Sequence, residues 1–196
     1  MSLPVIVGLV VCALLAAPAK STEEEADYST IDGTEVTEPE PEYYRMDKFM
    51  NTDDDIWVFN TTQSGPQDCK KDKKHNITNT NITFVRSHRE GHTIVNETLV
   101  GYFTHYSGNE TVYDGIDISG GTTDVYAEHL YYSSDDMKCG LVKVFAEKNT
   151  VWTELRVRGR ANYDSLDEEC RKEYKAYVDA IKPKKNSTSP YRDDCL

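Results

Sequence analysis

Eight short runs rich in β-branched and aromatic residues fill the middle of this chain, separated by clusters of Gly, Asn, Asp and Ser. Such composition and spacing are typical of antiparallel strands joined by tight turns. We expect strands at residues 55–61, 67–74, 81–88, 92–103, 110–118, 123–132, 139–147 and 151–159. Gly120-Gly121 and Lys148-Asn149 suit hairpin turns. The pattern predicts a sandwich or a barrel, and by itself it does not separate the two.

A single clear helix follows the last strand. Ser165 and Glu168 have the spacing of a capping box, in which each side chain satisfies a free backbone amide of the first turn. An apolar stripe recurs at helical spacing: Leu166, Cys170, Tyr174, Tyr177, Val178 and Ile181. Pro183 ends the helix. Eight antiparallel strands followed by a helix that lies on the sheet is the order of a lipocalin. The expected fold is therefore all-β with one C-terminal α-helix, an eight-stranded antiparallel lipocalin barrel.

The N-terminal region divides into two segments before the barrel. Residues 1–19 are mostly apolar and end in Ala17-Pro18-Ala19, which predicts a secretory signal peptide and a secreted, extracellular protein. Residues 20–42 hold nine of the 34 acidic residues, no Arg, and only Lys20 as a base, and we expect them to be a disordered acidic tail. We expect residues 43–196 to form one lipocalin domain that begins with a short helical turn between Tyr43 and Phe49.

Cysteines and glycosylation sequons support an extracellular setting. Cys12 lies in the expected signal peptide, and the remaining four are Cys69, Cys139, Cys170 and Cys195. An even set in a secreted chain indicates two disulfides, and counting alone leaves three pairings open. Six Asn-x-Ser/Thr sequons are present, at Asn60, Asn76, Asn81, Asn96, Asn109 and Asn186. None has Pro in the middle, so we expect each exposed one to accept a glycan.

From Tyr43 to Leu196 the chain resembles the tick salivary lipocalins, the family that includes the histamine-binding proteins. The residues that carry the resemblance are the segments 56–62 with Cys69 and Asp72, 133–136 with Cys139, Glu154-Leu155, Cys170 and 191–195. The resemblance implies the pairing Cys69–Cys195 and Cys139–Cys170. It also implies a salivary protein that sequesters a small host mediator. Amine-binding members carry an acidic and an apolar residue after the second cysteine and an aromatic after Glu-Leu, whereas this chain has Gly140, Leu141 and Arg156.

The last strand supplies the candidate ligand-binding residues. Because side chains alternate along a strand, Val151, Thr153, Leu155 and Val157 share one face, and Trp152, Glu154 and Arg156 share the other. We expect the apolar face beneath the helix and the second face toward the cavity. Glu154 and Trp152, with Tyr102 and Tyr126, would then hold a biogenic amine such as histamine or serotonin. Alternatively, Arg156 neutralises Glu154 and holds the carboxylate of a leukotriene or another fatty acid.

Other classes of function have less support in the sequence. No phosphate-cradling loop, nucleophile elbow or zinc-protease motif is present, so we expect neither an enzyme, a cofactor nor a metal site. His88 and His92 are expected to be solvated loop residues. The net charge of −12 argues against nucleic acid and anionic membranes as partners. We expect a monomer. The acidic tail could dock on a basic host protein, gaining association rate from its charge.

Overall fold

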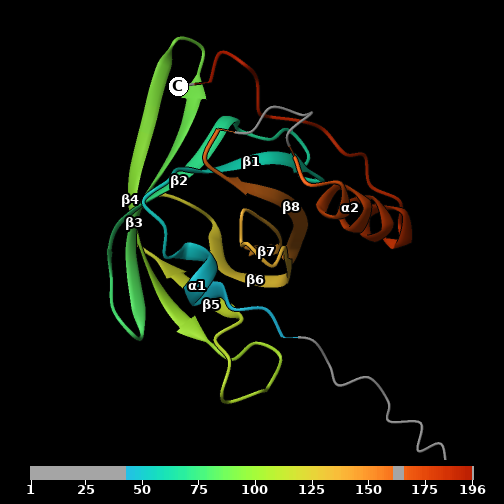
Figure 1. Cartoon of the computed structure of the whole chain (residues 1–196). Coiled ribbons are helices and arrows are strands. Elements are labelled where there is room, and N and C mark those ends of the chain that lie inside the picture. The colour runs from blue at the N-terminus through green and yellow to red at the C-terminus, as the bar shows by residue number, and fades with distance from the viewer. Residues whose placement is uncertain (1–42, 161–165, 196) are drawn as a thin grey trace, which may run out of the picture. The chain divides into compact units, whose positions relative to one another are not determined.

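The computed structural model describes residues 43–160 and 166–195, which form a closed antiparallel barrel (Figure 1). Its strands are β1 (Ile56–Thr61), β2 (Asp68–Ile77), β3 (Asn81–Glu90), β4 (Thr93–Thr104), β5 (Gly115–Ser119), β6 (Val125–Ser133), β7 (Cys139–Ala146) and β8 (Thr150–Arg158). Each strand pairs with its neighbour in sequence, and β1 pairs with β8 to close the ring. The predicted eight-stranded lipocalin barrel is confirmed, and the sandwich alternative is excluded.

The strands begin and end close to the predicted positions, with one exception. The fifth strand was expected at residues 110–118, but β5 begins only at Gly115. The preceding loop is held by the buried carboxylate of Asp114, which accepts hydrogen bonds from the backbone N–H groups of Tyr106 (2.7 Å) and Ser107 (3.0 Å). The β7–β8 turn is as predicted, because Lys148 and Asn149 both have φ of 57°, as a type I′ hairpin requires.

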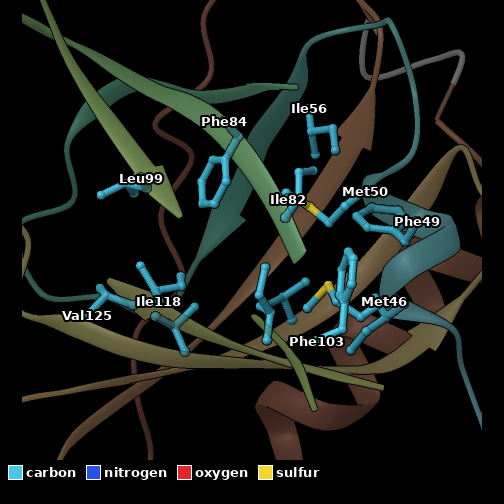
Figure 2. Packing of buried hydrophobic residues seen from close by; sticks show 14 of the residues in the cluster. Met46, Phe49, Met50, Ile56, Ile82, Phe84, Leu99, Phe103, Ile118 and Val125 are labelled. Atoms are coloured by element: carbon cyan, nitrogen blue, oxygen red, sulfur yellow. The ribbon is translucent and has the colours of Figure 1, made fainter. Parts of the chain in front are cut away.

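A short helix, α1 (Met46–Met50), fills one end of the barrel. Met46, Phe49 and Met50 are almost fully buried in the inner apolar cluster, next to Ile82 and Phe103 (Figure 2). The fit is tight: a Cβ at Gly140 would lie 2.9 Å from the Phe49 ring, closer than real contacts allow. Gly140, which follows Cys139, thus makes room for the α1 side chains.

The second helix, α2 (Glu168–Ala180), lies outside the barrel along β8 (Figure 1). Cys170, Tyr174 and Val178 pack against Leu155 and Val157, as the predicted apolar stripe requires. The helix start needs a correction: the N-cap is Asp167, whose carboxylate accepts from the backbone N–H groups at 169 and 170, and the helix begins at 168. Ser165, the predicted cap, lies outside the described residues.

Two disulfides fix the C-terminal part of the chain to the barrel. Cys69 in β2 pairs with Cys195 near the C-terminus, with a Cα–Cα distance of 5.4 Å. Cys139 at the start of β7 pairs with Cys170 in α2, at 6.6 Å. These are the pairs that the family resemblance implied. The predicted signal peptide (1–19) and acidic tail (20–42) lie outside the described residues. Among the helices of the described part, none is long and apolar enough to cross a membrane.

Candidate functional site

The inner face of β8 carries the predicted site residues into the barrel. Trp152 is 4 % exposed, and Glu154 and Arg156 are completely buried. The neighbours Leu155 and Val157 point outward to α2, so the alternation places the two faces as expected. Glu154 and Arg156 do not line an open hollow, however, because other charged residues surround them.

A layer of six charged side chains crosses the barrel interior at this level, and we call it the ionic layer. It comes from four strands: Lys70 and Asp72 of β2, Arg86 of β3, Glu128 of β6, and Glu154 and Arg156 of β8. Each is at most 3 % exposed. Three cations face three carboxylates, so the layer is neutral as a whole. Charges this deep in a protein are tolerated only when they are paired in this way.

The hydrogen bonds of the ionic layer centre on Arg156. Its Nε donates to Glu154 Oε2 (2.8 Å), while Nη1 and Nη2 donate to the two oxygens of Glu128 (2.6 and 2.7 Å). Arg86 makes a two-pronged pair with Asp72 (2.8 and 2.7 Å) and also reaches Glu128 (2.8 Å). Such fork-shaped guanidinium–carboxylate pairs are among the strongest hydrogen bonds in proteins. The ionic layer is therefore a rigid network of side chains that is cross-linked between strands.

Glu154 is the most heavily partnered carboxylate. Its Oε1 accepts from Lys70 Nζ (2.7 Å) and from the indole Nε1 of Trp152 (2.9 Å), and its Oε2 accepts from Arg156. Burial alone would raise the pKa of Glu154, but the charges of Lys70 and Arg156 more than offset burial and hold the pKa far below its usual range. The carboxylate stays ionised and already has three donors.

The other charges of the layer are fixed in the same way. Burial would raise the pKa of Glu128, but the charges of Arg156 and Arg86 lower it to about 2. Burial acts to lower the pKa of Arg156, and the carboxylates of Glu128 and Glu154 reverse that effect and raise it. For Lys70, burial wins over the attraction of Glu154, and the pKa lies below its usual value.

Beyond the ionic layer, at the end of the barrel away from α1, lies an open cavity of about 680 Å³ that we call the mouth cavity. The order of inner residues along β3 shows its place: Ile82 and Phe84 belong to the cluster around α1, Arg86 to the ionic layer, and His88 to the cavity wall. Lys70, Arg86 and Trp152 line its inner end. Its volume is typical of a site for a small molecule.

Two buried nitrogen atoms in the wall of the mouth cavity have no hydrogen-bond partner among the described residues. They are Nη1 of Arg86, a side chain that is 2 % exposed, and Nδ1 of His88, which is 7 % exposed. Leaving a buried polar atom unpaired costs about 1–3 kcal/mol. The two side chains that carry these atoms line the mouth cavity, so both are candidates to contact a polar group of a ligand there.

Several sequence-based assignments change in the structure. Tyr102 and Tyr126 are 52 % and 51 % exposed, since they alternate with the inward-facing Phe103 and Val125 and point outward. They do not line the interior, contrary to the prediction. His88 is a buried residue of β3 and not a solvated loop residue, whereas His92 is exposed in the β3–β4 turn.

None of Lys70, Asp72, Arg86 and Glu128 was assigned to the site from the sequence, and Asp72 was used only for the motif resemblance. A signal was present, because Ile82, Phe84 and Arg86 occupy alternate positions on one strand face, and an Arg continuing an inward apolar row needs a partner. The partners come from other strands, so only the register of the barrel brings them together.

The six sequon asparagines are all at least partly exposed.

Neither a protein-family model nor a curated protein matches this chain in sequence. Among solved structures, the chain is similar to Japanin from Rhipicephalus appendiculatus bound to cholesterol, at 11 % identity, with 74 % of this chain and 96 % of that chain covered and a TM-score of 0.51. Other similar structures are the major allergen Per a 4 from cockroaches (12 % identity, 68 % and 81 % covered, TM-score 0.48) and the siderocalin Ex-FABP (6 %, 64 % and 83 %, 0.47). At such identities only the fold is shared. The predicted resemblance to tick lipocalins is confirmed at that level by Japanin.

Proposed function

We propose that this protein, a lipocalin by fold, is a secreted binder that sequesters a small host mediator in its mouth cavity without turning it over. The two disulfides and the six partly exposed sequons support an extracellular setting. The motif resemblance to tick salivary lipocalins supports a role in suppressing host inflammation or haemostasis. Since the described part of the chain forms one mouth cavity, the protein would act stoichiometrically.

The observation that carries the proposal is the cationic inner end of the mouth cavity. Arg86 lines this end and offers an unpaired Nη1, and the Lys70 ammonium beside it has three N–H groups, of which one bonds Glu154. A carboxylate or another strong acceptor on the ligand would complete these donors. Arg86 thus takes the role that the sequence assigned to Arg156, whose guanidinium is fully engaged within the ionic layer.

The same geometry bears on the two ligand classes expected from the sequence. An amine bound at Glu154 would have to displace donors from Lys70, Trp152 or Arg156. A long fatty-acid tail has little room either, because the apolar half of the barrel is filled by the side chains of α1. A short ligand with an acceptor group at its inner end fits best.

A fluorescence titration tests this proposal. Trp152 lines the cavity, while Trp57 packs outside against Tyr191 and the Cys69–Cys195 disulfide, so ligand binding should change the emission of Trp152 alone. The recombinant protein is titrated with histamine, serotonin, a leukotriene and phenylacetate. We expect saturable binding of acid-bearing ligands, and Trp152→Phe should abolish the signal.

The matched variants are Arg86→Lys and Arg89→Lys. Both lie on β3 and keep their charge, but Arg89 faces outward and pairs with Asp68 and Asp194. Arg86→Lys should weaken acid binding about tenfold, because it removes a charge-assisted hydrogen bond. Arg89→Lys should change nothing. The proposal fails if no ligand binds, or if both variants bind like the wild type.

A further inference from the structure

The wall of the mouth cavity carries a carboxylate directly opposite Arg86. Arg86 of β3 and Glu97 of β4 are paired across the two strands, and both line the cavity. Directly opposed side chains of an antiparallel pair have Cβ atoms about 5 Å apart. They nevertheless do not form an ion pair with each other. The Arg86 guanidinium turns inward to Asp72 and Glu128.

The Glu97 carboxylate is held in place by the β5–β6 turn. Its Oε2 accepts from the backbone N–H of Thr122 (3.0 Å). Gly121 makes this possible, since a Cβ there would lie 2.5 Å from the same oxygen, and its φ of +67° also favours glycine. Gly121 and Thr122 line the cavity as well. Glu97 is thus an oriented acid, not a freely moving surface residue.

His88 adds a third polar contact on the same wall. It lies two residues after Arg86 on the same face of β3, about 6.6 Å further along the strand. Its Nε2 lies 3.0 Å from the Glu90 carboxylate. In the tautomer whose Nε2–H donates to Glu90, Nδ1 is an acceptor that has no partner among the described residues. Arg86 therefore offers a donor, and Glu97 and this tautomer of His88 offer acceptors, in the wall of one cavity.

We infer that the mouth cavity takes a small zwitterion of the amino-acid type, with its carboxylate on Arg86 and Lys70 and its ammonium on Glu97 and His88. The inference rests on the proposed function and names the ligand class for the same site. The remaining wall includes Trp152, Val125 and Val95, which suit a short aromatic or apolar side chain. Most of the other lining residues are polar, which disfavours a wholly apolar ligand.

Three ligands that differ only in their charged groups test the inference: phenylalanine, phenethylamine and 3-phenylpropanoate. Isothermal titration calorimetry on the full, secreted protein should show phenylalanine binding at least about tenfold tighter than either single-charge analogue. Glu97→Gln should reduce phenylalanine affinity to that of 3-phenylpropanoate and leave 3-phenylpropanoate binding unweakened. The control Glu147→Gln removes an exposed acid in the β7–β8 turn and should have no effect.

The outcomes separate this inference from the proposed function. If 3-phenylpropanoate or phenethylamine binds as tightly as phenylalanine, or if Glu97→Gln does not alter the preference, the zwitterion assignment is overturned and the carrier role stands. The same holds if the mediators of the earlier titration bind and none of the three phenyl ligands does. If nothing binds in either experiment, both proposals fall.

Discussion

The two halves of the barrel interior follow the same strands but are built for different tasks. In the closed half, Phe49 and Met46 of α1 pack against Ile82 and Phe103, and the space is filled (Figure 2). In the mouth half, the same inward alternation places Arg86 and other polar side chains around a cavity of about 680 Å³. The ionic layer separates them. One half contributes stability and the other is available for binding, so each can be altered with a different expected consequence.

The largest effect should come from the ionic layer that separates the two halves. Arg156→Met removes the cation that bridges Glu128 and Glu154 and leaves two buried carboxylates short of a partner. We expect a loss of about 3–5 kcal/mol in the free energy of unfolding, measured by urea denaturation. The exposed pair Lys175–Asp179 on α2 provides the control, since Lys175→Ala should cost about 0.5 kcal/mol or less. A loss for Arg156→Met as small as the control's would show that the layer is not structural.

A slightly smaller effect is expected in the closed half. Phe49→Ala leaves a void among Met46, Leu130 and the backbone of Gly140, and should cost about 3 kcal/mol. Ligand affinity at the mouth should stay within about twofold of the wild type, because Phe49 does not line that cavity. Denaturation and fluorescence titration of one preparation give both values. A parallel loss of affinity would show that the two halves are coupled, which contradicts their separate roles in stability and binding.

The sequence predicts the frame of the molecule better than its interior. Strand order, the outward face of β8 under α2 and the disulfide pairs follow from local pattern and motif resemblance. The ionic layer does not, because Lys70, Arg86 and Glu128 meet only through the register of four strands. Tyr102 was assigned to the cavity by residue type, but its register places it outside. The Tyr43–Phe49 segment was expected as a helical turn, and nothing local indicated that it would fill one end of the barrel.

The pH dependence of stability should reflect the ionic layer and not the apolar half. Glu128 and Glu154 face Lys70, Arg86 and Arg156, and both carboxylates have a lowered pKa, about 2 for Glu128. A carboxylate with a lowered pKa stabilises the fold fully above its unfolded value of about 4.5, and this contribution is lost as the pH falls toward the folded value. Urea denaturation should therefore show stability falling steadily between about pH 5 and pH 2. In Phe49→Ala the slope should be unchanged, whereas a flat profile in the wild type would contradict the pairing.

The smallest effect on stability is expected in the mouth half, from Glu97→Gln. The side chain is partly exposed, and the amide oxygen of Gln can still accept the hydrogen bond from the Thr122 backbone. We expect a change of about 0.5 kcal/mol or less in the free energy of unfolding, as is usual for a surface substitution. The same variant is expected to lose its preference for a zwitterion. Thermal unfolding should therefore show almost no change in stability, whereas calorimetry should show the lost binding preference. Phe49→Ala should show the opposite combination, with stability lost and ligand affinity kept. If Glu97→Gln instead destabilised the fold by several kcal/mol, the mouth half would have to be regarded as part of the packed structure, and its residues could not be free to serve a ligand.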